Sequence, residues 1–322
     1  MDFVDRGARK TKAPASDGVL LADKPVGLTS AAVVARVKRA LGGPKVGHLG
    51  TLDPFASGLL PLCVGQGTKA APYLNAADKG YRGTIRLGVA TDTLDITGKV
   101  TEQSEPRKYG TRELTAAANA FVGHIEQVPP AFSALKRGGV RMYELARRGV
   151  APQLEARSVT IHSLVLSAPR PALLAFEVEC SKGTYIRSLA RDLGKRLGCP
   201  AVLESLVRSR FGSFDLADAT GLDEIEGPGG ALVASNAMVP LPEALAHLTS
   251  VEIDEAEAIR IRAGRQEGLD ALAATGKDLG RIKLMNGNSL VAVAASASGA
   301  WKLERVFLPT GACPPRATVV GS

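Results

Sequence analysis

Alternation between apolar and polar residues in two segments constrains the fold of this chain most strongly. In residues 81–89, apolar residues alternate with Arg82, Thr84 and Arg86. Residues 173–181 alternate in the same way. A period of two places successive side chains on opposite faces of a β-strand. Both segments are therefore predicted to be strands, the first with one basic face.

Shorter patterns place helices among these strands. Thr29 or Ser30 can cap a helix N-terminus, and apolar residues at helical spacing follow as far as Leu41. Glycine and proline at 42–44 end this helix. Similar signals predict further strands at 18–25, 58–65 and 159–167, and further helices at 111–121 and 186–197.

The composition is typical of a globular protein with a polyanionic partner. The 322 residues suffice for two domains, because an average domain has about 150 residues. Hydrophobic residues make up 45% and charged residues 22%, which is typical of an ordered chain. A net charge of +8 and a pI near 9.4 favour a nucleic-acid partner only modestly.

The sequence shows no signal for export, membrane insertion or zinc binding. Residues 1–17 are polar and basic without an apolar core, so we expect a flexible arm and no secretory signal. No run approaches the roughly 18 apolar residues that span a bilayer. The four cysteines lack C-x-x-C spacing. Cys63 and Cys180 lie in apolar runs typical of buried free thiols, which favours a cytoplasmic location.

A glycine-rich loop around Asp53 is the strongest candidate site. Gly47 and Gly50 allow a tight turn, Pro54 stiffens the exit, and neighbouring apolar residues can anchor the loop against a core. On chemistry alone, Asp53 could cap a turn, bind a metal, or act as a nucleophile or base. A metal is the weakest of these, because only His48 and one carboxylate lie close together in sequence.

The whole string GHLGTLDPFASGLLPLCVGQGTK, residues 47–69, resembles the signature of the tRNA pseudouridine-55 synthases, the TruB family. This resemblance implies that Asp53 is the catalytic residue and that His48 contacts RNA near a flipped nucleotide. His48 could instead only pack the loop. The pattern L-x-DKP-x-G-x-TS at residues 21–30 resembles the opening motif of the family, and Lys24 within it is expected to bind substrate.

Two further motifs extend the resemblance. KGTYIRSLARDLG, residues 182–194, implies that Arg187 pairs with Asp53 and that Tyr185 lines a uracil pocket; Arg187 could instead bind a phosphate. LESLVRSR, residues 203–210, implies that Leu206 lies against the base. A strand tyrosine is usually a core residue. The resemblance nevertheless makes Tyr81 the stacking partner of the target base and the candidate general base.

The residues from about 128 to 150 form a basic segment. Two prolines, a Lys-Arg-Gly-Gly turn and an expected helix with Arg141, Arg147 and Arg148 describe a jointed surface element. Such a segment could be only a solvated loop and helix face. VPPAFSALK within it resembles the RNA-gripping insertion of the family. Asp95, in the segment after the first alternating strand, could hold its loop or contact RNA.

The predicted fold is of the α/β class (α+β type). It has a mixed, largely antiparallel central sheet flanked by helices and a small β-rich, PUA-like C-terminal domain; the sheet order follows only from the resemblance. The expected division is a basic arm at 1–17, a catalytic domain at 18–250 and an RNA-binding domain at 251–322. Residues 221–236 are glycine-rich and suggest a loose transition zone.

The expected function is isomerisation of uridine 55 in the T-arm loop of tRNA to pseudouridine. The base would be flipped out of the RNA, detached from its sugar and rejoined through C5. Asp53 could attack the sugar or the base, or abstract a proton. We expect tRNA as partner, no cofactor, no metal, no membrane, no obligatory protein partner and a monomer. A pseudouridine synthase for another RNA and a non-catalytic tRNA-binding or folding protein are the alternatives.

Overall fold

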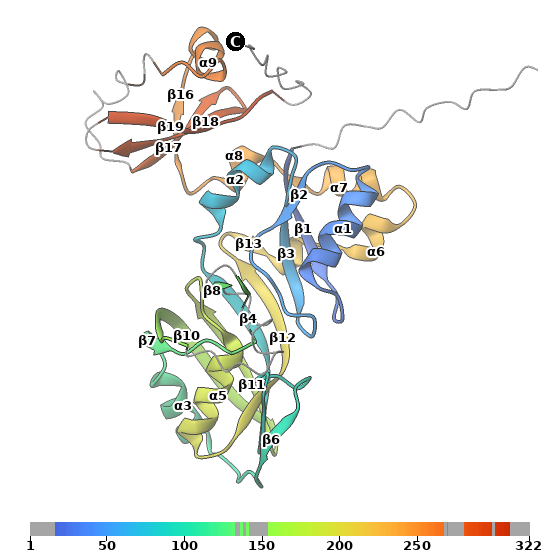
Figure 1. Ribbon diagram of the computed structural model, residues 1–322, viewed down its shortest axis with the longest axis vertical. Helices are drawn as coiled ribbons and strands as arrows, with labels where there is room; N and C mark the ends of the chain where they lie inside the picture. Colours follow the sequence, from blue (N-terminus) through green and yellow to red (C-terminus); the bar gives the residue numbers. More distant parts are fainter. Residues whose placement is uncertain are drawn as a thin grey trace, which may run out of the picture.

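The computed structural model of the chain describes residues 17–132, 136–137, 140–141, 154–266, 269, 280–297 and 300–309. Within these ranges, the protein consists of a mixed 11-stranded sheet with flanking helices and a separate 4-stranded sheet near the C-terminus (Figure 1). The predicted α+β architecture with a β-rich C-terminal region is confirmed. No helix in the described ranges is long and apolar enough to cross a membrane.

The large sheet follows the order β14-β1-β3-β12-β4-β11-β10-β7. The pairs β1–β14 and β3–β12 are parallel, whereas the other pairs along this path are antiparallel. These strands are β1 (Gly18–Lys24), β3 (Ser57–Val64), β4 (Lys79–Leu87), β7 (Gly123–Gln127), β10 (Arg157–Arg170), β11 (Leu173–Cys180), β12 (Ala201–Phe211) and β14 (Thr220–Gly221). Beside the path, β2 (Val46–His48) pairs with β3, β13 (Phe214–Asp215) with β12, and β15 (Met238–Val239) with β1.

Helices cover this sheet and short hairpins extend it. The helices of the described ranges include α1 (Ser30–Ala40), α2 (Gly67–Leu74), α3 (Thr111–Asn119), α5 (Ile186–Leu197), α6 (Leu222–Glu226), α7 (Gly230–Asn236), α8 (Leu241–Ala244) and the 3₁₀ turn η1 (Leu216–Asp218). The small hairpins are β5 (Val89–Thr91) with β6 (Val100–Gln103), and β8 (Lys136–Arg137) with β9 (Val140–Arg141).

The alternation in β4 produces the predicted two-faced strand. Tyr81, Ile85 and Leu87 are buried, while Arg82 and Arg86 are exposed. The buried face packs with the apolar stripe of α5 in one core cluster. Cross-strand packing of such alternating residues stabilises the sheet, and it fixes which β4 side chains face α5.

The C-terminal sheet has the order β16-β17-β18-β19, with helix α9 beside it. Its elements are β16 (Thr249–Glu252), α9 (Glu255–Arg262), β17 (Arg281–Asn286), β18 (Ser289–Ala297) and β19 (Ala300–Val306). This sheet has its own core cluster, yet Val293 and Phe307 share another cluster with Leu241 and Leu245. The domain boundary expected after residue 250 falls inside β16, because this strand runs from Thr249 to Glu252.

Two local expectations were wrong. Residues 221–236 are not a loose transition zone, because α6 and α7 form there and flanking strands β14 and β15 both pair with β1. Arg141, expected in a helix, belongs to β9. Arg147 and Arg148 lie outside the described residues. Short helices and two-residue strands carry too few residues for a periodic signal.

Candidate active site

The loop that carries Asp53 connects β2 to β3 and is anchored by buried side chains. Leu49 and Leu52 are buried, as expected for anchoring residues. Ser30, at the start of α1, is also buried; its hydroxyl accepts a hydrogen bond from Leu52 N at 2.9 Å and donates to Leu52 O at 3.2 Å. Because both backbone groups of Leu52 are satisfied by one side chain, the residue before Asp53 is held in one position.

Arg187, in the first turn of α5, meets Asp53 as the resemblance implied. Its Nε lies 2.9 Å from Asp53 Oδ2, and its Nη2 donates to Oδ1 at 3.3 Å. Two parallel contacts between a guanidinium and a carboxylate fix orientation as well as charge. The Arg187 side chain is only 7% exposed, whereas that of Asp53 is 36% exposed. The Asp53 carboxylate is thus partly open to solvent, whereas the guanidinium that it pairs with is buried.

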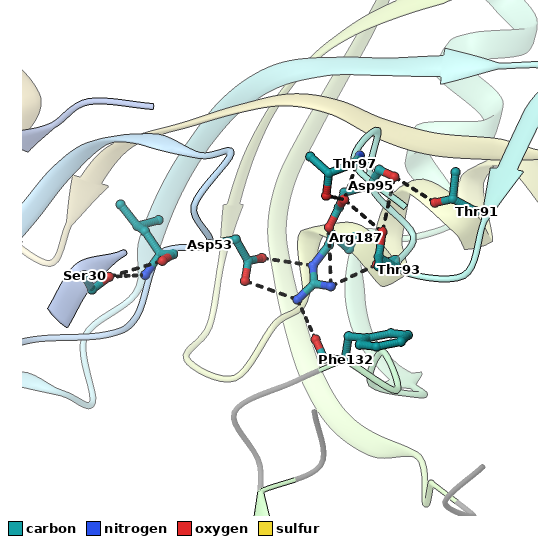
Figure 2. A network of polar contacts seen from close by, with 9 residues as sticks. Ser30, Asp53, Thr91, Thr93, Asp95, Thr97, Phe132 and Arg187 are labelled. Atoms are coloured by element: carbon teal, nitrogen blue, oxygen red, sulfur yellow. Dashed lines mark hydrogen bonds and ion pairs between the residues drawn. The ribbon is translucent and has the colours of Figure 1, made fainter. Parts of the chain in front are cut away.

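A turn centred on Asp95 holds Arg187 from the opposite side, as Figure 2 shows. Asp95 Oδ2 lies 3.6 Å from Arg187 Nη1, and the same Nη1 donates to Thr93 O at 2.9 Å. Asp95 Oδ1 accepts hydrogen bonds from the Thr93 hydroxyl and from Thr97 N and Oγ1. Of the two roles open for Asp95, this geometry shows the first: it holds its own loop.

Burial and charge act against each other on Asp53. Burial raises the pKa of Asp53 above its ordinary value, the Arg187 guanidinium lowers it, and the Asp95 carboxylate raises it again. An ionised carboxylate in a partly dry site needs such a cation. Arg187 therefore keeps Asp53 in the charged form that a nucleophile or base requires.

Asp53 opens onto a pocket of about 290 Å³ between its loop, β4, β12 and the start of α5. Tyr81, Tyr185, Leu206 and Arg187 all line this pocket, so the structure brings these sequence-predicted residues together with Asp53. Lys79 and Arg208 line it as well, and the sequence reasoning did not single them out. Apolar and aromatic walls around one carboxylate suit the capture of a flat base.

Tyr81 is buried, and its hydroxyl is hydrogen-bonded to the Arg208 guanidinium. Burial raises the pKa of Tyr81, and Arg208 opposes this rise. The phenol is thus protonated near neutral pH, and Arg208 is the neighbouring group that stabilises a phenolate. Tyr81 also shares the α5 core cluster, so the core interpretation and the pocket interpretation of this residue both hold.

Lys24 does not line the pocket. It is fully buried, and its Nζ donates to Ala56 O at 2.6 Å, to Pro25 O at 2.9 Å and to Pro54 O at 3.4 Å. This placement does not fit the expected contact of Lys24 with substrate. Its ammonium instead ties β1 to the part of the loop that follows Asp53, a structural use that the pattern around Lys24 could not reveal.

His48 lies in β2, beside the Asp53 loop but outside the pocket lining. It is half-buried, and its Nδ1 has no hydrogen-bond partner among the described residues. Burial and the Arg208 charge lower the pKa of His48, so the ring is neutral near pH 7. A neutral ring here is compatible with packing of the loop and with contact to an RNA base.

The basic segment between β7 and β10 reaches the site through its backbone. Phe132 O accepts a hydrogen bond from Arg187 Nη2 at 2.9 Å. Between Phe132 and residue 154, the structure describes only the short β8–β9 hairpin, which carries Lys136, Arg137 and Arg141 of the expected RNA grip. Whether this segment binds RNA stays a prediction. No cluster of metal-ligating side chains occurs among the described residues.

Comparison with known proteins identifies the class. The profile of the "TruB family pseudouridylate synthase (N terminal domain)" matches residues 38–186, which include Asp53, Tyr81 and Tyr185. Together with the α+β sheet and the Asp53 pocket, this match over part of the chain indicates the class of the pseudouridine synthases, which are isomerases.

Curated relatives narrow the class. tRNA pseudouridine synthase B of Geobacter sulfurreducens is 43% identical over 302 residues, covering 90% of this chain and 99% of that protein. Its namesake from Thiobacillus denitrificans is 47% identical over 252 residues, covering 78% and 84%. The chain belongs to the TruB family.

Solved structures agree on the fold. A chain in the crystal structure of a Cbf5-Nop10-Gar1 complex has a TM-score of 0.63 at 25% identity, covering 91% of this chain and 85% of that chain. A second, in an H/ACA RNP bound to a substrate RNA containing 2'-deoxyuridine, also scores 0.63, at 24% identity.

Proposed function

We propose that this chain converts uridine 55 in the T-arm loop of tRNA to pseudouridine. The relatives named tRNA pseudouridine synthase B match it over nearly their whole length, which supports tRNA as the substrate. The single observation that carries the proposal is the bidentate Asp53–Arg187 pair at the mouth of an aromatic pocket.

The pocket explains why the base must leave the RNA stack. Asp53 lies against Tyr81 and Leu206 in a recess that an intact RNA stem cannot enter, so the target nucleotide is extruded. Extrusion costs free energy, because the base loses its stacking in the RNA. Stacking of the uracil on the Tyr81 ring offsets part of that free energy, since such stacking is worth about 1–3 kcal/mol. The pocket walls then hold the detached uracil, whose escape would leave an abasic site.

The side chains divide the reaction among them. The N1–C1′ bond breaks with its electron pair going to uracil, while the Asp53 carboxylate either bonds to the sugar or takes a sugar proton. A bond from C5 to C1′ then forms, and Asp53 returns to its starting state. The Tyr81 phenol gives its proton to N1, and the resulting phenolate, beside the Arg208 guanidinium, takes the proton from C5, which restores the phenol.

The isomerisation exchanges one carbon–nitrogen bond for one carbon–carbon bond within a single substrate. No electrons leave the substrate and no group is added, so the side chains named above supply the chemistry and we expect no cofactor. We expect the protein to act in the cytoplasm as a single chain with tRNA as its partner. We also propose a catalytic domain that ends before β16 and an RNA-binding domain that begins with this strand at Thr249, instead of a boundary after residue 250.

Nucleotide-resolution mapping of pseudouridine in an unmodified tRNA transcript tests the proposal. We expect one modified position, uridine 55, after incubation with the protein. A transcript with cytidine at position 55 serves as control and should remain unmodified. Modification elsewhere with uridine 55 untouched would show a different RNA specificity, and binding without any modification would favour the non-catalytic alternative.

A further inference from the structure

The active-site pocket holds more buried positive charge than negative charge. Lys79 is 8% exposed and Arg208 1% exposed, and both line the pocket. Among the described residues, neither has a carboxylate within ion-pair distance. Asp53, the carboxylate that lines the pocket, and Asp95 both pair with Arg187, and Asp78, the residue before Lys79, pairs with His162. Buried charges are normally paired, because desolvation is expensive. The excess charge therefore indicates a place for an anion.

Strand register brings the two cations together. β4 and β12 are antiparallel neighbours in which Tyr81 pairs with Arg208 and Lys79 pairs with Phe211. Lys79 Nζ lies 4.4 Å from the centre of the Phe211 ring, and Arg208 Cζ lies 5.4 Å from it. We call Lys79, Arg208 and Phe211 the cation wall. Gly50 lies against this wall at φ +69°, where a Cβ would come within 3.3 Å of Arg208 Nη1.

Among the described residues, the hydrogen-bond acceptors of Lys79 and Arg208 are backbone carbonyls and the neutral phenol of Tyr81. Arg208 donates to Leu59 O at 2.7 Å and to Gly50 O at 3.2 Å, besides its hydrogen bond with Tyr81. Lys79 donates to the carbonyl of Ala77. Carbonyl dipoles orient these groups without neutralising their charges. An ammonium has three N–H donors, so Lys79 can still donate into the pocket.

We propose that Lys79, with Arg208 beside it, is a further catalytic residue that stabilises negative charge on the detached uracil. This inference rests on the proposed function. When the N1–C1′ bond breaks, both bonding electrons stay with uracil and form an anion delocalised over N1, O2 and O4. Fixed cations aimed at charge that develops during a reaction lower its barrier. The anion is consumed when C5 bonds to C1′.

The surroundings of Lys79 agree with this role. The pKa of Lys79 is lowered to about 8, because burial, Arg208 and Lys182 lower it more than Cys180 and Asp78 raise it. A lysine is charged below its pKa, so Lys79 is mostly an ammonium at pH 7 and loses its charge as the pH rises through about 8. Uracilate formation should therefore slow above that pH.

The test compares single-turnover rates at saturating tRNA for the wild type, Lys79→Met and Lys79→Arg. Lys38→Met, which removes an exposed charge from α1, is the matched control and should be unchanged. Two tRNA substrates are compared, one with uridine and one with 5-fluorouridine at the target position. The measured quantity is the rate at which the N1-linked nucleoside disappears from each. We expect Lys79→Met to slow uridine about 10²–10³-fold, the usual effect of removing one such donor. Lys79→Arg should restore most of the rate.

Fluorine stabilises the uracil anion, so the defect of Lys79→Met should shrink at least roughly tenfold with 5-fluorouridine. The wild-type rate should fall above about pH 8, and that of Lys79→Arg should not. Equal slowing of both nucleotides, or a change in tRNA affinity alone, would overturn the inference. The wild-type pH profile needs no variant and decides the matter if Lys79→Met misfolds. Wild-type protein that leaves uridine in tRNA unchanged would instead refute the proposed function.

Discussion

At the scale of single residues, Arg187 determines what Asp53 can do. Its Nε and Nη2 contact both oxygens of Asp53, while Thr93 O and Phe132 O accept from Nη1 and Nη2. Asp95 lies behind it, 3.6 Å from Nη1. A guanidinium held from several sides can present Asp53 in only one orientation. The Asp53 carboxylate is thereby preorganised for the role that we propose for it.

The raised pKa of Asp53 predicts how the reaction rate falls at acidic pH. A reactive carboxylate must be deprotonated, and burial moves the Asp53 pKa upward while Arg187 opposes it. Single-turnover rates should therefore decline on acidification at a pH above the ordinary aspartate pKa of about 3.9. Rates measured across the acid range in a folded sample test this. A decline centred at or below the ordinary value would contradict the burial argument.

Tyr81 separates stacking from proton transfer. Tyr81→Phe keeps the ring, so tRNA affinity should persist, but loss of the hydroxyl should slow product formation about 10²–10⁴-fold. Tyr81→Leu should also weaken binding, because stacking is worth about 1–3 kcal/mol. Filter binding and single-turnover conversion measure the two effects. If Tyr81→Phe reacts at nearly the wild-type rate, Tyr81 is only a stacking platform.

At the scale of elements, the turn between β5 and β6 acts as a clamp on α5. Asp95 pairs with Leu203 of β12 in an isolated bridge, and Ile96 N donates to Leu203 O at 2.9 Å. The same turn supplies Thr93 O and the Asp95 carboxylate to Arg187. A turn fixed to the central sheet thus fixes a side chain of the helix.

Asp95→Asn should weaken this clamp without unfolding the protein. Hydrogen bonds to charged groups are worth about 1.5–3 kcal/mol, so the single-turnover rate should fall roughly 10–100-fold. Asp92→Asn is the control: Asp92 is exposed on the same turn and accepts from Lys99 N. It should react like the wild type. Equal rates for the wild type and both variants would show that Asp95 does not position Arg187.

Sequence reasoning succeeded where periodicity or a long motif carried the information. The alternation in β4 and β11 predicted those strands, and the motif resemblance alone implied the Asp53–Arg187 pair. The cation wall was missed because Lys79 and Arg208 meet only through the register of β4 and β12, which is interrupted by bulges. Lys24 was predicted to bind substrate because it belongs to a family motif, but a motif does not show where a side chain points.

At the scale of the whole molecule, the glycine-flanked segment after β3 connects the two sheets. Gln66 Nε2 donates to Leu308 O at 2.7 Å and its Oε1 accepts from Leu308 N at 3.0 Å. Lys69 Nζ donates to Val306 O at 3.0 Å. Together with the apolar cluster shared by Leu245 and Phe307, these bonds join the C-terminal sheet to the catalytic part.

Gln66→Ala should loosen the C-terminal sheet while leaving the chemistry intact. Two hydrogen bonds to Leu308 are lost, so amide hydrogen exchange should accelerate in β19. Affinity for tRNA should fall, and the single-turnover rate at saturating tRNA should be retained. Gln103→Ala, an exposed position in β6, is the control. Unchanged exchange in β19 would mean that the apolar cluster alone holds the sheet in place.

Tritium release from 5-tritiated uridine in unmodified tRNA tests whether Asp53 is catalytic, because only bond formation at C5 followed by loss of the C5 proton frees the label. We expect one equivalent of tritium per tRNA with the wild type. We expect none with Asp53→Asn, although tRNA binding by this variant should stay within about tenfold, or about 1.4 kcal/mol. Release by Asp53→Asn at more than a tenth of the wild-type rate would contradict the assignment of Asp53 as the catalytic residue.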